Sequence, residues 1–146
     1  MPHLTLQIAP GGPIIDLLVA VSRARSQALQ AGGQPVPNPV QIRALVDTGA
    51  SCTCIDPSVL KSLGLTPTGT APIHTPSTGQ KPHYANQYDV SLVLLHPKLS
   101  LTFHTAAVVE AHLAAVQGVQ GLVGRDLLSN CLLVYDGQSG RFTLAF

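Results

Sequence analysis

Charged residues are scarce in this chain of 146 residues: Asp, Glu, Lys and Arg make up 10% of it, and the formal net charge is +1. The basic residues form no stripe and no long run, which argues against a nucleic-acid partner. Low charge together with 45% hydrophobic residues has two explanations, apolar surface kept for a partner or only a strand-rich core. The length fits one domain, residues 1–146, with a core of its own.

Long apolar runs are also absent. The longest, residues 14–21, is interrupted by Asp16 and is far shorter than the roughly 20 residues that a membrane-spanning helix needs. No basic segment precedes it, as it would in a secretory signal. The cysteines number three, and Cys52 and Cys54 are too close in sequence for an ordinary disulfide. We therefore expect a cytoplasmic protein with reduced thiols and no membrane partner.

Signatures of metal and nucleophile chemistry are missing too. No pair of histidines has the i, i+4 spacing of a helical metal site; the histidines are His3, His74, His83, His96, His104 and His112. The Gly-x-Ser-x-Gly pattern of serine hydrolases is absent. A Cys-x-Cys metal site completed by Cys131 or a histidine is the alternative to cysteines that pack as small apolar side chains. We favour packing and predict neither a metal nor a cofactor.

The most informative segment is Asp47-Thr48-Gly49. Residues 40–46, just before it, alternate in the manner of a half-buried strand, so the chain carries a carboxylate out of a sheet into a tight turn. We expect Gly49 to adopt backbone angles that a Cβ would forbid, and the Thr48 hydroxyl to lock the loop. The same triplet is also ordinary turn chemistry, so it does not decide the function alone.

A second motif lies about 75 residues downstream, where Gly121-Leu122-Val123-Gly124-Arg125 leads into a short predicted helix. In this order and spacing, the two motifs resemble those of the retropepsin-like aspartic proteases, single-lobed relatives of pepsin. The resemblance covers roughly residues 39–146 and one strand before them. It implies an all-β fold with one or two short helices, closed like a barrel, in a homodimer.

The resemblance also implies a mechanism in which two carboxylates share one proton and activate a water. The chain has one Asp-Thr-Gly and no second copy, so a second, identical chain would supply the other acid. Asp47, Thr48 and Gly49 are thus the candidate catalytic residues of a peptidase, and its partners are itself and a peptide or protein substrate. The alternative is a catalytically silent module of the same fold that binds peptides or mediates dimerisation.

Further site residues follow from the same resemblance. Ala50 would leave space for a substrate side chain, and Leu122 and Val123 would line the pocket wall. A hairpin near residues 73–80 would close over the substrate as a flap, with binding residues Thr75, Pro76, Ser77, Thr78 and Gly79. A plain surface hairpin is the alternative there. Tyr84 could reach back to the cleft.

Arg125 is predicted to support the site structurally, but its partner is open. Retroviral members commonly carry an aspartate two residues past the motif glycine, which pairs with this arginine. Here that position is Ser51. Arg125 could instead contact neighbours of Asp126, a main-chain carbonyl or the other subunit.

The remaining pattern predicts strands and two short helices. A helix over residues 23–31 ends at Gly32-Gly33, and residues 22–38 are an insertion relative to a retroviral protease. Asp56-Pro57 predicts the start of a helix that ends at Gly64. A hairpin joins residues 131–135 to 141–146. The resemblance implies that segments 1–6 and 142–146 interleave with those of a second subunit; pairing within one subunit is the alternative.

Overall fold

The computed structural model describes the backbone of residues 1–146 and every side chain except those of residues 116 and 117. It is mainly β with short helices, as predicted. In chain order, the elements are β1 (His3–Gln7), β2 (Ile14–Val21), α1 (Arg23–Ala31), β3 (Val40–Val46), β4 (Cys54–Ile55), α2 (Pro57–Ser62), β5 (Gly69–Ile73), β6 (His83–Leu94), β7 (Leu101–Glu110), α3 (Ala114–Gln117), β8 (Gly121–Val123), α4 (Arg125–Leu128), β9 (Leu132–Asp136) and β10 (Arg141–Ala145).

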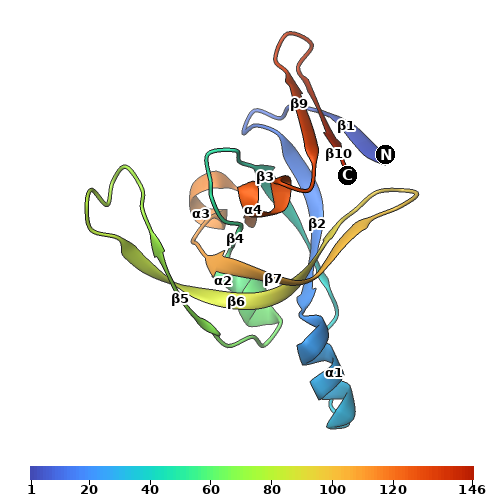
Figure 1. Ribbon diagram of the computed structural model, residues 1–146, viewed down its shortest axis with the longest axis vertical. Coiled ribbons are helices and arrows are strands. Elements are labelled where there is room, and N and C mark those ends of the chain that lie inside the picture. The colour runs from blue at the N-terminus through green and yellow to red at the C-terminus, as the bar shows by residue number, and fades with distance from the viewer.

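Six strands form a closed barrel, which confirms the predicted barrel-like, mainly β fold of the chain. They follow the order β2-β3-β8-β4-β7-β6, and β6 pairs back with β2. Alternate residues of β2 are fully buried inside the barrel, among them Leu17 and Val19, as the period of two in a strand requires. Strand β5 pairs with β6 outside the closed ring and forms a long hairpin with it (Figure 1).

A second sheet contains the two ends of the chain, in the order β1-β10-β9. Leu4 lies opposite Leu144, and Thr143 lies opposite Val134. Phe142 and Leu144 are buried against the barrel core. Both edges of β10 are therefore occupied within one chain, so the expectation that segment 142–146 interleaves with a second subunit is wrong; the terminal strands pair in the alternative way.

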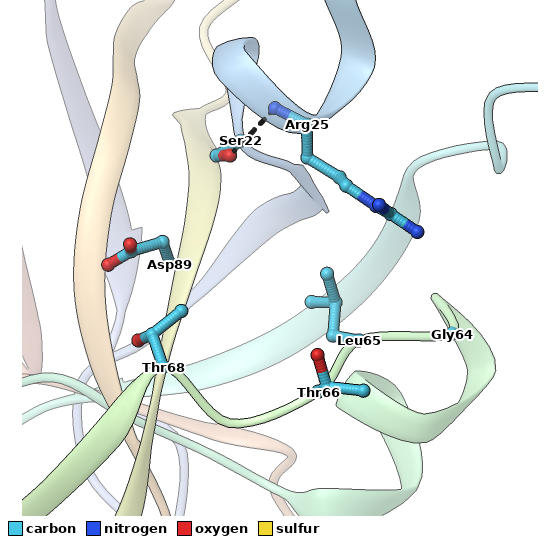
Figure 2. Close-up of a pocket in the computed structure, with 7 residues that line it drawn as sticks. All are labelled: Ser22, Arg25, Gly64, Leu65, Thr66, Thr68 and Asp89. Atoms are coloured by element: carbon cyan, nitrogen blue, oxygen red, sulfur yellow. Dashed lines mark hydrogen bonds between the residues drawn. The ribbon is translucent and has the colours of Figure 1, made fainter. Parts of the chain in front are cut away.

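Helix α1 begins and ends as the sequence predicts. The Ser22 side chain accepts a hydrogen bond from the Arg25 N–H at 3.2 Å, and the helix ends at Gly32, followed by Gly33 with φ of 65°. Figure 1 shows α1 projecting from the end of the barrel opposite the β9–β10 hairpin. A small hollow between the first turn of α1 and the segment after α2 is shown in Figure 2; Thr68 and Asp89 also border it. The predicted insertion thus lies on a different part of the barrel from Asp47.

Helix α2 is fixed by Asp56, its N-cap, with Pro57 in the first turn. The Asp56 carboxylate accepts hydrogen bonds from the Ser58 N–H at 3.0 Å, the Leu113 N–H at 2.9 Å and the Ala114 N–H at 3.0 Å. Burial alone would raise the pKa of Asp56, but these bonds outweigh burial and hold the pKa well below its usual range. Asp56 therefore ties α2 to the segment after β7.

Within the described residues, no helix is both long and apolar enough to cross a membrane.

Candidate functional site

Asp47 lies at the end of β3, where the chain leaves the barrel wall. Its N–H donates to the Val123 carbonyl at 3.0 Å, and its half-buried side chain accepts a hydrogen bond at Oδ1 from the Gly49 N–H at 2.8 Å. Gly49 does not have the positive φ that we expected. A Cβ at this position would instead lie 3.1 Å from Asp47 Oδ1. Glycine avoids this close contact, which a larger residue would relieve only by shifting the Asp47 carboxylate by a few tenths of an ångström.

Gly124 lies directly beneath the loop that carries Asp47. A Cβ on Gly124 would lie 2.6 Å from both the carbonyl carbon and the carbonyl oxygen of Cys52, and 3.1 Å from the Ala50 oxygen. The same Ala50 oxygen accepts the Arg125 N–H at 2.9 Å. Because these are backbone atoms, which cannot move aside as a side chain can, only glycine permits this crossing.

Thr53 and Asp126 clamp the far end of the same loop. Thr53, which is fully buried, donates its N–H to Asp126 Oδ2 at 2.9 Å and its hydroxyl to Asp126 Oδ1 at 2.8 Å. The hydroxyl also accepts the Gly124 N–H at 3.1 Å. This clamp was not predicted; its one signal in the sequence is a threonine between two cysteines in an apolar segment.

Arg125 contacts a main-chain carbonyl, one of the three kinds of partner that the sequence allowed. Its Nη1 donates a hydrogen bond of 2.8 Å to the main-chain carbonyl of Thr48. The guanidinium therefore supports the Asp47 loop through its backbone, without the carboxylate that retroviral relatives would place at residue 51.

A cavity of about 400 Å³ opens beside the Asp47 carboxylate, between its loop and the β5 end of the hairpin. It is lined by Asp47, Gly49, Ala50, Ser51, Cys52, Cys54, Ile73, His74, Thr75, Pro76, Ala111 and Leu122. A half-buried acid beside a mostly apolar cavity is the arrangement expected of a catalytic or binding cleft.

Comparison with known proteins agrees with this geometry. A family model described as "Aspartyl protease" matches residues 20–127. The chain belongs to the aspartyl protease family. It is similar in structure to a retropepsin-like aspartic protease from Rickettsia conorii, with a TM-score of 0.60, 18% sequence identity, and coverage of 99% of this chain and 90% of that one. This likeness confirms the retropepsin-like fold. No curated protein sequence matches the chain.

The structure separates the predicted catalytic and binding residues of this aspartyl protease family member into two groups. Ala50, Thr75, Pro76 and Leu122 line the cavity together with Asp47 and Gly49. The others lie elsewhere: Ser77, Thr78 and Gly79 in the hairpin turn, outside the lining of this cavity, Thr48 beside a different hollow, and Val123 fully buried in the barrel core. Val123 therefore supports the pocket from behind and does not line it.

The hairpin turn has a defined conformation. The Thr75 N–H donates to the Thr78 hydroxyl at 2.9 Å, the Thr78 N–H donates to the Thr75 carbonyl at 3.0 Å, and Gly79 has φ of 60°. Tyr84 is 64% exposed and borders a neighbouring hollow with Glu110. It does not reach the cavity beside Asp47, contrary to the sequence-based suggestion.

Cys52 and Cys54, which we predicted to pack as small apolar side chains, line the cavity and do not lie wholly in the core. Burial, the neighbouring Cys52 and nearby carboxylates raise the pKa of the Cys54 thiol to about 12. Cys54 therefore stays protonated at neutral pH and acts as a small apolar surface. Cys52 is half-buried. Among the described residues, no group of three or more His, Cys, Asp or Glu side chains is arranged to hold a metal.

Proposed function

We propose that this protein is an aspartic endopeptidase that hydrolyses peptide bonds through a water held between two Asp47 carboxylates, one from each chain of a homodimer. The observation that carries the proposal is the Asp47 carboxylate, half-buried beside a cavity in a member of the aspartyl protease family. Its Oδ1 is oriented by the Gly49 N–H, as a catalytic group must be.

The need for a second chain follows from the residues around the cavity. Asp47 is the one carboxylate that borders it among the described side chains. Peptide hydrolysis by this chemistry requires a base and an acid together, and two carboxylates that share a proton supply both. An identical chain related by a two-fold axis would place its own Asp47 opposite the first.

In the proposed reaction, the ionised carboxylate takes a proton from the water as the water oxygen attacks the carbonyl carbon of the peptide. The protonated carboxyl gives its proton to the carbonyl oxygen, which produces a tetrahedral diol. The carbon–nitrogen bond then breaks as the nitrogen receives a proton from the first carboxyl, and one diol hydroxyl returns its proton to the second. The products are a carboxylic acid and an amine, and the pair regains its single shared proton.

The substrate proposed for the cavity is a peptide in extended conformation. The lining includes the apolar side chains of Ile73, Ala111 and Leu122, which suit an apolar substrate side chain. The backbone of the Asp47 loop and of the β5–β6 hairpin would hydrogen-bond the peptide main chain. In this proposal the hairpin acts as the flap, and its closure would exclude bulk water.

The test is peptide cleavage by the wild-type chain, Asp47→Asn and the matched control Asp16→Asn, assayed on a peptide library at mildly acidic pH. Asp16 is an exposed carboxylate on β2. We expect Asp47→Asn to lower kcat/KM by roughly a thousandfold or more, as expected for loss of general acid–base catalysis, and Asp16→Asn to match the wild type. Equal cleavage by Asp47→Asn and wild type would refute the assigned site.

Mixing the two chains tests whether the acid pair is shared. With equal amounts of wild-type and Asp47→Asn chains exchanging freely, about one quarter of the dimers carry two Asp47 residues. Activity per wild-type chain should therefore fall by half. Activity that stays proportional to the wild-type chain alone would show that one chain works by itself. Peptide binding without cleavage by the wild type would support the silent binding module.

A further inference from the structure

We infer that this protein selects peptides that carry a basic side chain, lysine or arginine, and that the Glu110 carboxylate binds this side chain in a hollow next to the cavity beside Asp47. The inference rests on the proposed function, because it takes the cavity as the place where the peptide binds. A carboxylate outside the reacting pair would thus decide which peptides are bound.

The hollow adjoins the cavity. It measures about 450 Å³ and is lined by the end of β5, the start of β6 and the end of β7. Ile73, Thr75 and Ala111 border both the hollow and the cavity. In an extended peptide, side chains two positions apart point to the same side and lie about 7 Å from each other. A peptide with one side chain in the cavity can therefore place the side chain two positions away in the hollow.

Glu110 gives the hollow its negative charge. It carries the one carboxylate among the described residues that line the hollow, and none of these residues is a lysine or an arginine. The other ionisable lining groups, His83, Tyr84 and His112, are exposed, whereas Glu110 is half-buried. Histidine and tyrosine side chains are ordinarily neutral at about pH 7.5. At that pH the hollow therefore attracts a cation, and partial burial of Glu110 reduces the screening of this attraction by water.

Two neutral side chains hold the Glu110 carboxylate in place. The Tyr88 hydroxyl donates to Oε2 at 2.8 Å, and the Asn86 side-chain N–H donates to Oε1 at 3.4 Å. Burial, together with the hydrogen bond to Glu110, raises the pKa of Tyr88, which keeps its hydroxyl protonated as a donor. The two oxygens of a carboxylate can accept about four hydrogen bonds in all. Glu110 therefore keeps acceptor sites for the N–H donors of a basic side chain, and neither neutral partner cancels its charge.

The test measures peptide binding to the chain with Asp47→Asn, which serves as the parent so that no peptide is cleaved. The probes are eight-residue peptides with leucine near the centre, for the cavity, and lysine, norleucine or glutamate two positions before or after that leucine. Norleucine has an unbranched apolar side chain without charge, so the comparison with lysine reports on the charge. Isothermal titration at about pH 7.5 and low salt gives the Kd of each peptide.

For the parent, the lysine peptide should bind roughly tenfold more tightly than the norleucine peptide, as expected for one hydrogen bond to a charged group. Glu110→Gln should lose this discrimination. Glu110→Lys should reverse it, so that the glutamate peptide binds more tightly than the lysine peptide, and such a reversal cannot come from unfolding. Asp89→Asn is the matched control and should keep the ratio of the parent, because Asp89 is also a half-buried carboxylate but borders the hollow beside α1 (Figure 2).

Three results would overturn the inference. The first is an equal Kd of the parent for the lysine and norleucine peptides. The second is a lysine peptide that does not bind the parent at about 1 mM. The third is a preference for lysine that survives in Glu110→Gln.

Cleavage separates this inference from the proposed function. If the chain with Asp47 cleaves peptides but the parent shows no preference for lysine, the peptidase proposal stands and the assigned role of Glu110 fails. If the lysine peptide is selected through Glu110 but the chain with Asp47 cleaves no peptide, the role of Glu110 in peptide binding stands and the peptidase proposal fails.

Discussion

Replacing Thr53 with valine tests the clamp that holds the Asp47 loop. Valine has nearly the same shape as threonine but no hydroxyl. The substitution leaves the Gly124 N–H without its partner at 3.1 Å and removes the 2.8 Å bond to the Asp126 carboxylate. A buried group left unpaired costs about 1–3 kcal/mol, and a lost bond to a charged group costs about as much. We expect a loss of about 3 kcal/mol in the free energy of unfolding.

The assay is urea unfolding at one fixed chain concentration, because the stability of the proposed dimer would depend on concentration. With a slope near 2 kcal/mol/M, the Thr53→Val midpoint should fall by roughly 1.5 M. Thr53→Ser keeps the hydroxyl and loses one buried methyl, which costs about 1 kcal/mol, or roughly 0.5 M. If the serine variant loses as much as the valine variant, packing of the methyl group dominates and the clamp argument fails.

Two further predictions concern ionisable groups. The pKa of Asp56 is held below its value in the unfolded chain, so the stabilisation by Asp56 is complete above about pH 4 and is lost as pH falls below that value. In urea unfolding from pH 7 to 2.5, the free energy of unfolding should therefore fall more steeply with acid for the wild type than for Asp56→Asn. Equal pH dependence of the two proteins would contradict this assignment. A maleimide should label Cys52 well before Cys54, because the pKa of the Cys54 thiol is raised to about 12. Protein labelled at Cys52 should lose peptide cleavage because the adduct fills the cavity, and mass spectrometry of digested protein identifies the labelled residue. Cys52→Ser, which keeps the free thiols of Cys54 and Cys131, is the control and should keep its cleavage activity after the same treatment.

The parts of this fold that could be predicted from the sequence carry local signals. The strand before Asp47 shows its period of two, and the helix from Arg23 is ended by two glycines. The helix after Asp56 combines an N-cap with a proline in its first turn. Each signal lies within a few neighbouring residues, so one sequence is enough to read it.

The contacts that could not be predicted join distant segments. Arg125 bonds a main-chain carbonyl, and every residue offers one, so no residue type marks the partner. The pairing of β1 with β10 has the same alternating pattern whether the partner strand is in the same chain or another. Gly49 could be identified as important, but whether its φ or the space beside Asp47 required glycine depends on coordinates.

The crossing of the Asp47 loop over Gly124 has a consequence for folding during synthesis. Residues separated by 77 positions in sequence must meet before Arg125 reaches Thr48. Closing so long a segment is slow compared with local structure. While the chain is still being synthesised, the loop that carries Asp47 therefore lacks its native conformation. Any peptidase activity requires that synthesis has passed Asp126.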